Sequence, residues 1–241
     1  MNINLNCDLG EALGNDALIM PHLSACNIAC GGHYGNSITV KQTIQLAQQH
    51  KVKIGAHPSY PDFKNFGRVS LNISEEELTQ SLQSQLALFK KIVAQQNTKL
   101  HHIKAHGALY NDVAKDVQKA NIYLKAVESF KESCKLFVPP NSAIFSLAKQ
   151  QGFLICVEAF ADRTYNDDLS LVNRKLPNAL IQKPQQASEQ VISIAENKIV
   201  KTANGREVLI KADTFCVHSD TTNAIEIIRH IRKYFSSKNI N

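Results

Sequence analysis

The stretch Ile3-Asn4-Leu5-Asn6-Cys7-Asp8 alternates apolar and polar side chains, which is the pattern of a β-strand. Successive side chains of a strand point to opposite sides, so the odd-numbered residues share an apolar face and the even-numbered residues share a polar one. In a parallel barrel the apolar face meets the surrounding helices. The stretch therefore predicts a barrel strand whose polar side chains point into the barrel, the last of them being Asp8.

After this stretch, runs of residues typical of β-strands alternate with longer runs typical of helices. Candidate strands cover residues 3–8, 25–31, 52–57, 100–106, 136–139, 153–160 and 213–218. Candidate helices cover residues 37–50, 75–96, 112–133, 142–151, 184–195 and 221–235, and Ser74 with Glu77 forms a capping-box signal at the start of the second. The alternation indicates parallel βαβ units. We predict a TIM-like (β/α) barrel, seven-stranded, as a single domain over residues 1–241; a doubly wound open sheet is the alternative.

Two connections are longer than the usual 2–6 or so residues of α/β units. They cover residues 59–73 and 163–181, and both begin directly after a strand with a polar end. We expect functional loops there. Residues 196–211 predict a small extra hairpin that turns at Asn204-Gly205.

Composition bounds the class of protein. Hydrophobic residues make up 44% of the chain and charged residues 20%, which is ordinary for a globular protein. No run is long enough and apolar enough for a membrane span, and the N-terminus lacks a secretory pattern, so we expect a cytoplasmic protein.

The net charge of +6 is scattered over helical stretches, which favours a solvated surface over a nucleic-acid partner. The six cysteines are expected to be free, buried thiols.

Ionisable side chains recur at the carboxyl ends of the candidate strands. Barrel enzymes build their sites at this face, because the loops converge there. Burying several such charges without partners costs several kcal/mol each, so packing alone is a poor explanation. We therefore predict a functional cleft lined by Asp8, His33, His57, Lys104, His106, Glu158 and His218.

Several common chemistries lack their signatures. The sequence has no phosphate-binding loop of the Walker A type and no GxGxxG. It also lacks the GxSxG and HExxH patterns of serine hydrolases and zinc proteases. Carboxylate, imidazole and lysine chemistry in a barrel mouth remains, with or without a metal.

A set of ordered motifs is more specific than any of these patterns. They are Asn6-Cys7-Asp8-Leu9-Gly10-Glu11, Asn27-Ile28-Ala29-Cys30-Gly31-Gly32-His33, Gly55-Ala56-His57-Pro58-Ser59-Tyr60-Pro61-Asp62, Phe66-Gly67-Arg68, Lys104-Ala105-His106-Gly107-Ala108-Leu109-Tyr110-Asn111, Phe160-Ala161-Asp162-Arg163 and Ala212-Asp213-Thr214-Phe215-Cys216-Val217-His218. In this order the set closely resembles the LamB/YcsF family, and the resemblance covers residues 3 to about 232.

The resemblance implies a barrel related to the glycoside hydrolase/deacetylase fold. It also implies the A subunit of a 5-oxoprolinase, which opens the 5-oxoproline lactam to L-glutamate with coupled hydrolysis of ATP. B and C subunits are the implied partners, and ATP with Mg²⁺ the implied cofactors.

Roles for single residues follow from this implied reaction. Phosphates and the substrate carboxylate need cations, for which we expect Arg68, Lys104 and Arg163. We place His33, His57 and Asp162 with them as substrate- or ATP-binding residues. Attack by water needs a base, Asp8 or Glu158, and the ring nitrogen needs an acid, His106 or His218. Glu11 is expected to orient its neighbours.

Two other functions stay open. The first is a metal-dependent deacetylase or amidohydrolase that acts alone, with Asp8, His57 and His106 as the metal ligands. The second is a non-catalytic binding subunit of the complex, with the chemistry in its partners.

Overall fold

A closed ring of seven parallel strands forms the centre of the structure, a computed structural model that describes residues 3–238. Around the ring the strands are β1 (Leu5–Leu9), β2 (Ala25–Ala29), β3 (Lys53–His57), β4 (Leu100–Lys104), β5 (Lys135–Val138), β6 (Leu154–Phe160) and β9 (Thr214–Cys216). The last strand closes the ring by pairing with both β6 and β1. The TIM-like barrel is confirmed, and the open sheet is wrong.

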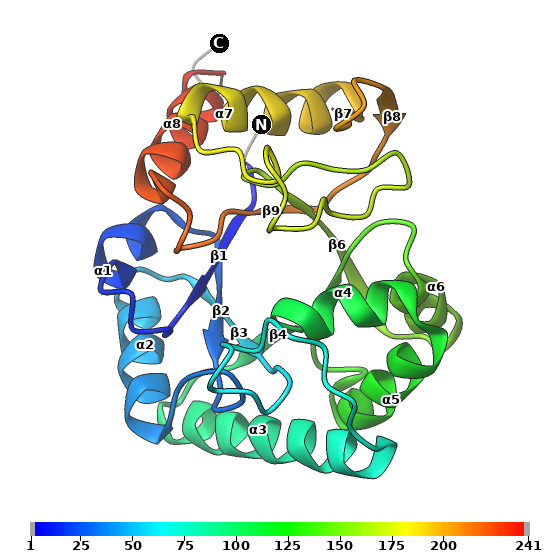
Figure 1. The fold of residues 1–241 in the computed structure, drawn as a ribbon. Coiled ribbons are helices and arrows are strands. Elements are labelled where there is room, and N and C mark those ends of the chain that lie inside the picture. Colours follow the sequence, from blue (N-terminus) through cyan, green and yellow to red (C-terminus); the bar gives the residue numbers. More distant parts are fainter. Residues whose placement is uncertain (1–2, 239–241) are drawn as a thin grey trace.

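Helices surround this ring (Figure 1). They are α1 (Asp16–Ile19), α2 (Ser37–Gln49), α3 (Glu75–Gln95), α4 (Gly107–Lys115), α5 (Val117–Val127), α6 (Ala143–Gln150), α7 (Pro184–Ile192) and α8 (Ala224–Ser237). Ser74 and Glu77 form the predicted capping box at the start of α3. The hairpin β7 (Ile199–Lys201) and β8 (Glu207–Leu209) is also present.

One predicted helix is wrong. The apolar periodicity predicts a single helix over residues 112–133, but the chain breaks at Asp116 into α4 and α5. The side chain of Asp116 accepts hydrogen bonds from the backbone N–H groups of Gln118 and Lys119, so it starts a new helix instead of continuing the old one. The periodicity runs across this break and for that reason does not reveal it.

Apolar residues fill the space between the strands and the helices. Leu5, Cys7 and Leu9 of β1 are completely buried there, whereas Asn6 and Asp8 face the interior of the ring. The predicted orientation of the first strand is therefore correct. All six cysteines are buried and free, as expected.

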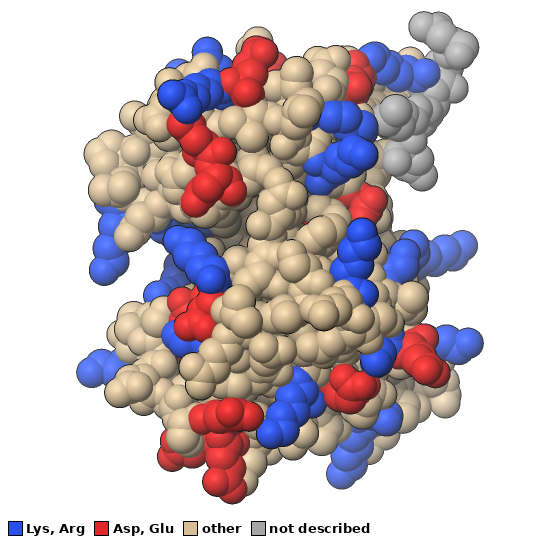
Figure 2. All heavy atoms as spheres, turned by 90° about the vertical axis from the view of Figure 1, so that its right-hand side faces the viewer, with Lys and Arg blue, Asp and Glu red and all other residues tan. Residues whose placement is uncertain are grey.

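The surface mixes both signs of charge. Figure 2 shows lysine and arginine side chains interspersed with aspartate and glutamate on one face of the molecule. Within the described residues, no helix is both long and apolar enough to cross a membrane. The expected single domain over residues 1–241 extends at both ends beyond the residues described.

Candidate active site

A fully buried lysine lies at the centre of the barrel mouth. Lys104, the last residue of β4, donates a hydrogen bond from Nζ to Asp8 Oδ1 over 3.0 Å. The same Nζ lies 3.0 Å from Glu158 Oε1 and 3.1 Å from Cys216 Sγ. Four strands, β1, β4, β6 and β9, thus bring their side chains together at one ammonium group.

Charge compensation decides the ionisation of this cluster. Burial alone would lower the pKa of Lys104, but the charges around it, Asp8 foremost, outweigh burial and hold it well above its ordinary value. Burial would raise the pKa of Asp8, but His57 and Lys104 outweigh it and hold it well below. Both groups are therefore charged at neutral pH, and each is the counter-ion that permits burial of the other.

Three histidines pack beside this ion pair. His33 and His106 stack in parallel with their ring centroids 3.5 Å apart, and His57 meets them edge-on. His106 Nδ1 lies 3.0 Å from His57 Nε2, which in turn lies 3.4 Å from Asp8 Oδ2. The rings are thus in contact with each other and with the ion pair.

Main-chain carbonyls determine which ring nitrogens carry a proton. His57 Nδ1 lies 2.9 Å from the carbonyl oxygen of Lys104, and His106 Nε2 lies 2.9 Å from that of Phe66. A carbonyl can only accept, so both of these nitrogens are donors. Burial holds the pKa of His106 well below its ordinary value, so this ring is neutral and its Nδ1 carries a lone pair.

Glu11 completes the cluster on the side of His33. Its Oε1 lies 2.9 Å from His33 Nε2 and 3.4 Å from His106 Nδ1. Burial, together with the nearby charge of Asp8, raises the pKa of Glu11 to about 7. Burial lowers the pKa of His33 to about 2, so this ring is neutral and donates to Glu11. Glu11 can therefore exchange a proton near neutral pH, which suits a group that orients its neighbours or moves protons.

A chain of hydrogen-bonded polar side chains inside the barrel holds Asp8 in place. Asn27 Nδ2 donates to Asp8 Oδ1 over 2.7 Å and to Asn6 Oδ1 over 2.8 Å. Burial holds the pKa of His102 well below its ordinary value, and this neutral ring contacts Asn27 Oδ1 over 2.6 Å. The His102 ring fits only because residue 55 is glycine: a Cβ there would lie 2.1 Å from His102 Nε2.

A fourth acidic group, Asp162, lies beside this cluster at the mouth. It accepts hydrogen bonds from the backbone N–H of His218 and from the hydroxyl of Thr221. Its carboxylate also lies 3.1 Å from the His218 Nδ1 atom. Burial would raise the pKa of Asp162, but the charge of His218 and these hydrogen bonds outweigh it and lower the pKa. The pair thereby fixes the His218 ring, which stacks on Phe160.

The two predicted arginines have different surroundings. Arg163 is buried and donates hydrogen bonds to the carbonyl oxygens of Val172 and Ala179, so it holds the loop after β6 in shape. Arg68 is exposed and pairs with Asp220 over 2.6 Å. Arg174 shares the same carboxylate over 2.8 Å. The two guanidinium groups that pair with Asp220 therefore stand at the rim of the mouth.

Three neighbouring hollows open at the barrel mouth, and Lys104 lines one of them. An inner pocket of about 50 Å³ is lined by residues that include Asp8, His57, Lys104 and His218. A basic cleft of about 510 Å³ has five cations among its lining residues: Arg68, Lys115, Arg163, Arg174 and Lys175. A side pocket of about 310 Å³ reaches Glu158. Asn111 and Leu171 line all three, so the hollows adjoin one another.

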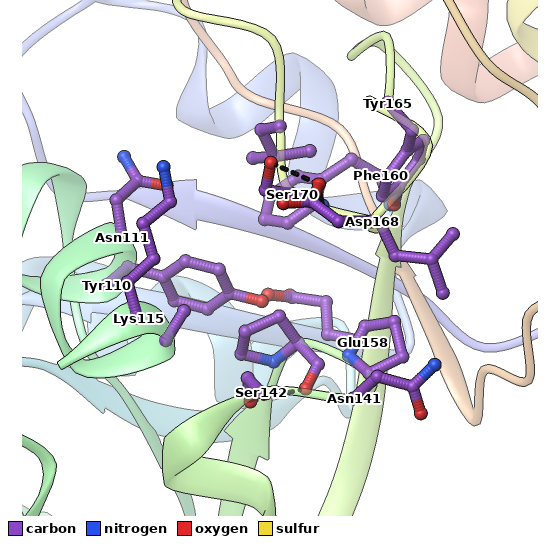
Figure 3. A pocket seen from close by; sticks show the side chains of 15 residues that line it. Tyr110, Asn111, Lys115, Asn141, Ser142, Glu158, Phe160, Tyr165, Asp168 and Ser170 are labelled. Carbon is purple, nitrogen blue, oxygen red and sulfur yellow. Dashed lines mark hydrogen bonds between the residues drawn. The ribbon is translucent and has the colours of Figure 1, made fainter. Parts of the chain in front are cut away.

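Figure 3 shows the side pocket from close by. The Tyr110 hydroxyl points toward the carboxylate of Glu158, and the loop after β6 covers the opposite wall with Asp168 and Ser170. Neither oxygen of Glu158 accepts a well-aligned hydrogen bond within residues 3–238, and its side chain is completely buried. A buried carboxylate with spare acceptor capacity can bind an N–H or O–H group of a ligand.

The structure brings nearly all the predicted site residues into one mouth. Asp8, Glu11, His33, His57, Lys104, His106 and Glu158 form one contiguous buried cluster, with Asp162 and His218 beside it and the two arginines further out. The sequence patterns assign no role to Asn27, Tyr110 or Phe160. Asn27 lies within an otherwise apolar strand, and this signal could have identified it. The two aromatic residues give no such signal.

Comparisons with known proteins agree with this architecture. Residues 3–241 match the model of the LamB/YcsF family. The chain is 40% identical to the 5-oxoprolinase A subunit of Staphylococcus aureus strain Newman, over 100% of this chain and 98% of that protein, and equally identical to that of strain USA300 / TCH1516. It superimposes on the crystal structure of a lactam utilization protein from Thermus thermophilus with a TM-score of 0.92, at 32% identity, over 99% of this chain and 98% of that one. The chain with this buried lysine and histidine cluster belongs to the LamB/YcsF family.

Proposed function

We propose that this chain is the A subunit of an ATP-dependent 5-oxoprolinase, and that its barrel mouth binds 5-oxoproline and opens the lactam to L-glutamate. The observation that carries the proposal is Lys104, a buried ammonium held between Asp8 and Glu158 that lines the inner pocket. The name shared by the Staphylococcus aureus relatives, that of the 5-oxoprolinase A subunit, supports the same function. B and C subunits are the partners that the proposal requires.

The shapes of the hollows suit a small lactam with a carboxylate. The side pocket, at about 310 Å³, lies at the small end of the range for ligand pockets, which is about 300–1,000 Å³. Glu158 offers acceptor oxygens there for the lactam N–H. The basic cleft next to it offers guanidinium groups for a carboxylate or a phosphate, and Arg68 and Arg174 reach its rim.

Lys104 would act on the carbonyl end of the lactam. An ammonium in a water-poor site stabilises negative charge on an oxygen much better than it does in bulk water. Transfer of the terminal phosphoryl group of ATP to the lactam oxygen would release ADP and make an imidate-like species. Water, deprotonated by Asp8 or Glu158, would attack its carbon, and the ring C–N bond would break as the nitrogen takes up a proton. A second water would hydrolyse the acyl phosphate that remains to L-glutamate and inorganic phosphate. Asp162 orients His218, which stands at the inner pocket as the acid for the ring nitrogen.

ATP and Mg²⁺ belong to this proposal as co-substrate and companion ion. The chain has no Gly-rich phosphate loop, so we expect the phosphate contacts here to come mainly from the cationic side chains of the basic cleft. We propose that the cleft receives the phosphate-bearing species, while the partner subunits share in handling the nucleotide.

The test is turnover of 5-oxoproline by this chain alone, and by this chain mixed with its partner subunits, with and without ATP. We expect glutamate and ADP to form together, and only in the complete mixture. Lys104→Met should lower turnover at least about 10³-fold without loss of assembly, whereas Lys125→Met, which removes an exposed lysine, should not. Glutamate formed without ATP would refute the proposal. Full turnover by Lys104→Met would instead place the chemistry in the partners.

A further inference from the structure

Two histidines and an aspartate in the barrel mouth point electron pairs at one another. The atoms are His57 Nε2, His106 Nδ1 and Asp8 Oδ2, and all three lie within 4.8 Å of each other. Each histidine uses the N–H on its other nitrogen for a main-chain carbonyl, Lys104 for His57 and Phe66 for His106. When both rings are neutral, the converging atoms are acceptors that face acceptors, and this arrangement requires a cation between them, either a proton or a metal ion.

A proton would satisfy this requirement only in part. One proton on His57 Nε2 can bridge to a single neighbour, either His106 Nδ1 at 3.0 Å or Asp8 Oδ2 at 3.4 Å. The third electron pair would remain unmatched in a buried site. A metal ion accepts all three electron pairs at once.

The distances match those between the ligands of one small ion. An ion about 2.1 Å from each ligand holds neighbouring ligands about 3.0 Å apart at a right angle and about 3.4 Å apart at the tetrahedral angle. The observed separations are 3.0 Å between the two nitrogens and 3.4 Å between His57 Nε2 and Asp8 Oδ2. The side chains thus need little movement to receive the ion.

The surroundings have the features of a metal site. A histidine ligand usually donates its second N–H to a carbonyl or carboxylate, which fixes the ring and its tautomer, and both rings do so here. The other oxygen of Asp8 is held by Lys104 and Asn27. Two carboxylates, Asp8 and Glu158, share the single charge of Lys104, and a third, Glu11, lies beside His106, so the cluster can accept further positive charge.

The other two groups with suitable spacing fit less well. In the group of Glu11, His33 and His106, His33 already donates a hydrogen bond to Glu11. In the group of Asp8, Cys216 and His218, burial holds the pKa of the Cys216 thiol well above its ordinary value, and His218 is engaged by Asp162. Among these three groups of described residues, the first alone presents three unshared electron pairs.

We propose that Asp8, His57 and His106 bind one divalent transition-metal ion, of the Zn²⁺, Co²⁺ or Mn²⁺ class that two imidazoles and a carboxylate select. When bound, such an ion would supply a Lewis acid beside the inner pocket, which Asp8 and His57 line. The site rests on the geometry of these three residues. It shares Asp8 with the proposed oxoprolinase reaction, but metal binding is measured without turnover.

The test measures metal content and spectra, so its outcome does not depend on turnover. The purified full-length chain is stripped with a chelator, titrated with Zn²⁺ or Co²⁺, and analysed by calorimetry and by visible absorption of the Co²⁺ form. We expect one ion per chain. His57→Gln and His106→Gln should each weaken binding at least about 100-fold, a loss as large as those known for weaker, outer-shell changes. The control, His50→Gln with His230→Gln, removes two exposed imidazoles and should leave binding unchanged.

Nitrogen NMR of the wild-type imidazoles keeps the test decisive if the variants fail to fold. The proposal expects that Zn²⁺ shifts His57 Nε2 and His106 Nδ1 while their partner nitrogens stay protonated. A proton found on His57 Nε2 in the presence of excess Zn²⁺ overturns it. So does equal binding by wild type and both site variants, or loss of binding in the surface control alone.

Discussion

Replacing Lys104 by methionine tests whether one ammonium holds the barrel mouth together. Methionine keeps an unbranched chain of similar length, so the change removes a charge and little volume. The side chain is 2% exposed and faces carboxylate oxygens of Asp8 and Glu158, each at 3.0 Å. After the substitution these two carboxylates face each other across an apolar side chain.

The magnitude follows from this burial. Breaking a buried ion pair by removing one partner costs about 3–5 kcal/mol, because the remaining charge stays desolvated. We expect Lys104→Met to lower the free energy of unfolding by that amount at pH 7. Glu158→Gln in the same chain removes one of the two stranded charges, so the double variant should recover about 1–2 kcal/mol.

The assay is urea unfolding, with the m-value compared between variants to confirm that the surface exposed on unfolding is unchanged. The matched control is Lys125→Met, which breaks an exposed pair with Glu75 and should cost less than about 1 kcal/mol. If Lys104→Met also stays within about 1 kcal/mol of wild type, Lys104 is not the counter-ion of the cluster. If the double variant is less stable than Lys104→Met alone, the explanation by an unpaired buried charge is wrong.

Three further predictions concern the support of the site. Gly55→Ala should cost about 2–5 kcal/mol in urea unfolding, because its Cβ would overlap the His102 ring, and the cost should nearly vanish in a His102→Ala background. Asp162→Asn should destabilise the protein at pH 6. The folded-state pKa of Asp162 is lowered, so its carboxylate adds to the free energy of unfolding above the unfolded pKa of about 3.9, and this stabilisation is lost as the pH falls through the folded-state pKa. The difference in unfolding free energy between the variant and wild type should therefore be smaller at about pH 3.5 than at pH 6. Ser142→Ala should cost about 0.5–2 kcal/mol, since its hydroxyl caps α6 through the N–H of Phe145, and an unchanged thermal midpoint would contradict this.

The barrel and its inner face are predictable from the sequence because both depend on local patterns. Seven alternating strands and the side on which Asp8 lies follow from period-two alternation, which a single chain displays. The break at Asp116 does not follow from it, because the choice between continuing a helix and restarting one depends on a side-chain hydrogen bond of about 1 kcal/mol. Alternation also continues past the last ladder hydrogen bond, so the predicted strands run on to His106 and His218, which lie just beyond β4 and β9.

The sequence predicts which residues gather at the candidate site, but not the contacts that their side chains make with one another. Their common position at strand ends indicates one mouth, and the barrel places them there. The stacking of His33 on His106 and the buried link from Lys104 to Glu158 depend on the order in which strands adjoin and on loop shapes. Arg163 illustrates the limit, because its guanidinium holds a loop through carbonyl groups that no sequence pattern marks.

Closure of the ring between the first and the last strand has a consequence for the newly made protein. Asn6 donates to Thr214, and the hydroxyl of Ser219 donates to the carbonyl of Asp8, so residues from the two ends of the sequence meet at the site. At about 5–20 residues per second, a ribosome needs roughly 10–40 s to reach these partners after it has made Asp8. Until β9 is made, the nascent sheet has two open edges, β1 and the strand made most recently, which is β6 at the end of the interval. The barrel mouth is therefore among the last parts of the molecule to form, and a chain released before β9 retains the carboxylate of Asp8 but lacks the enclosure around it.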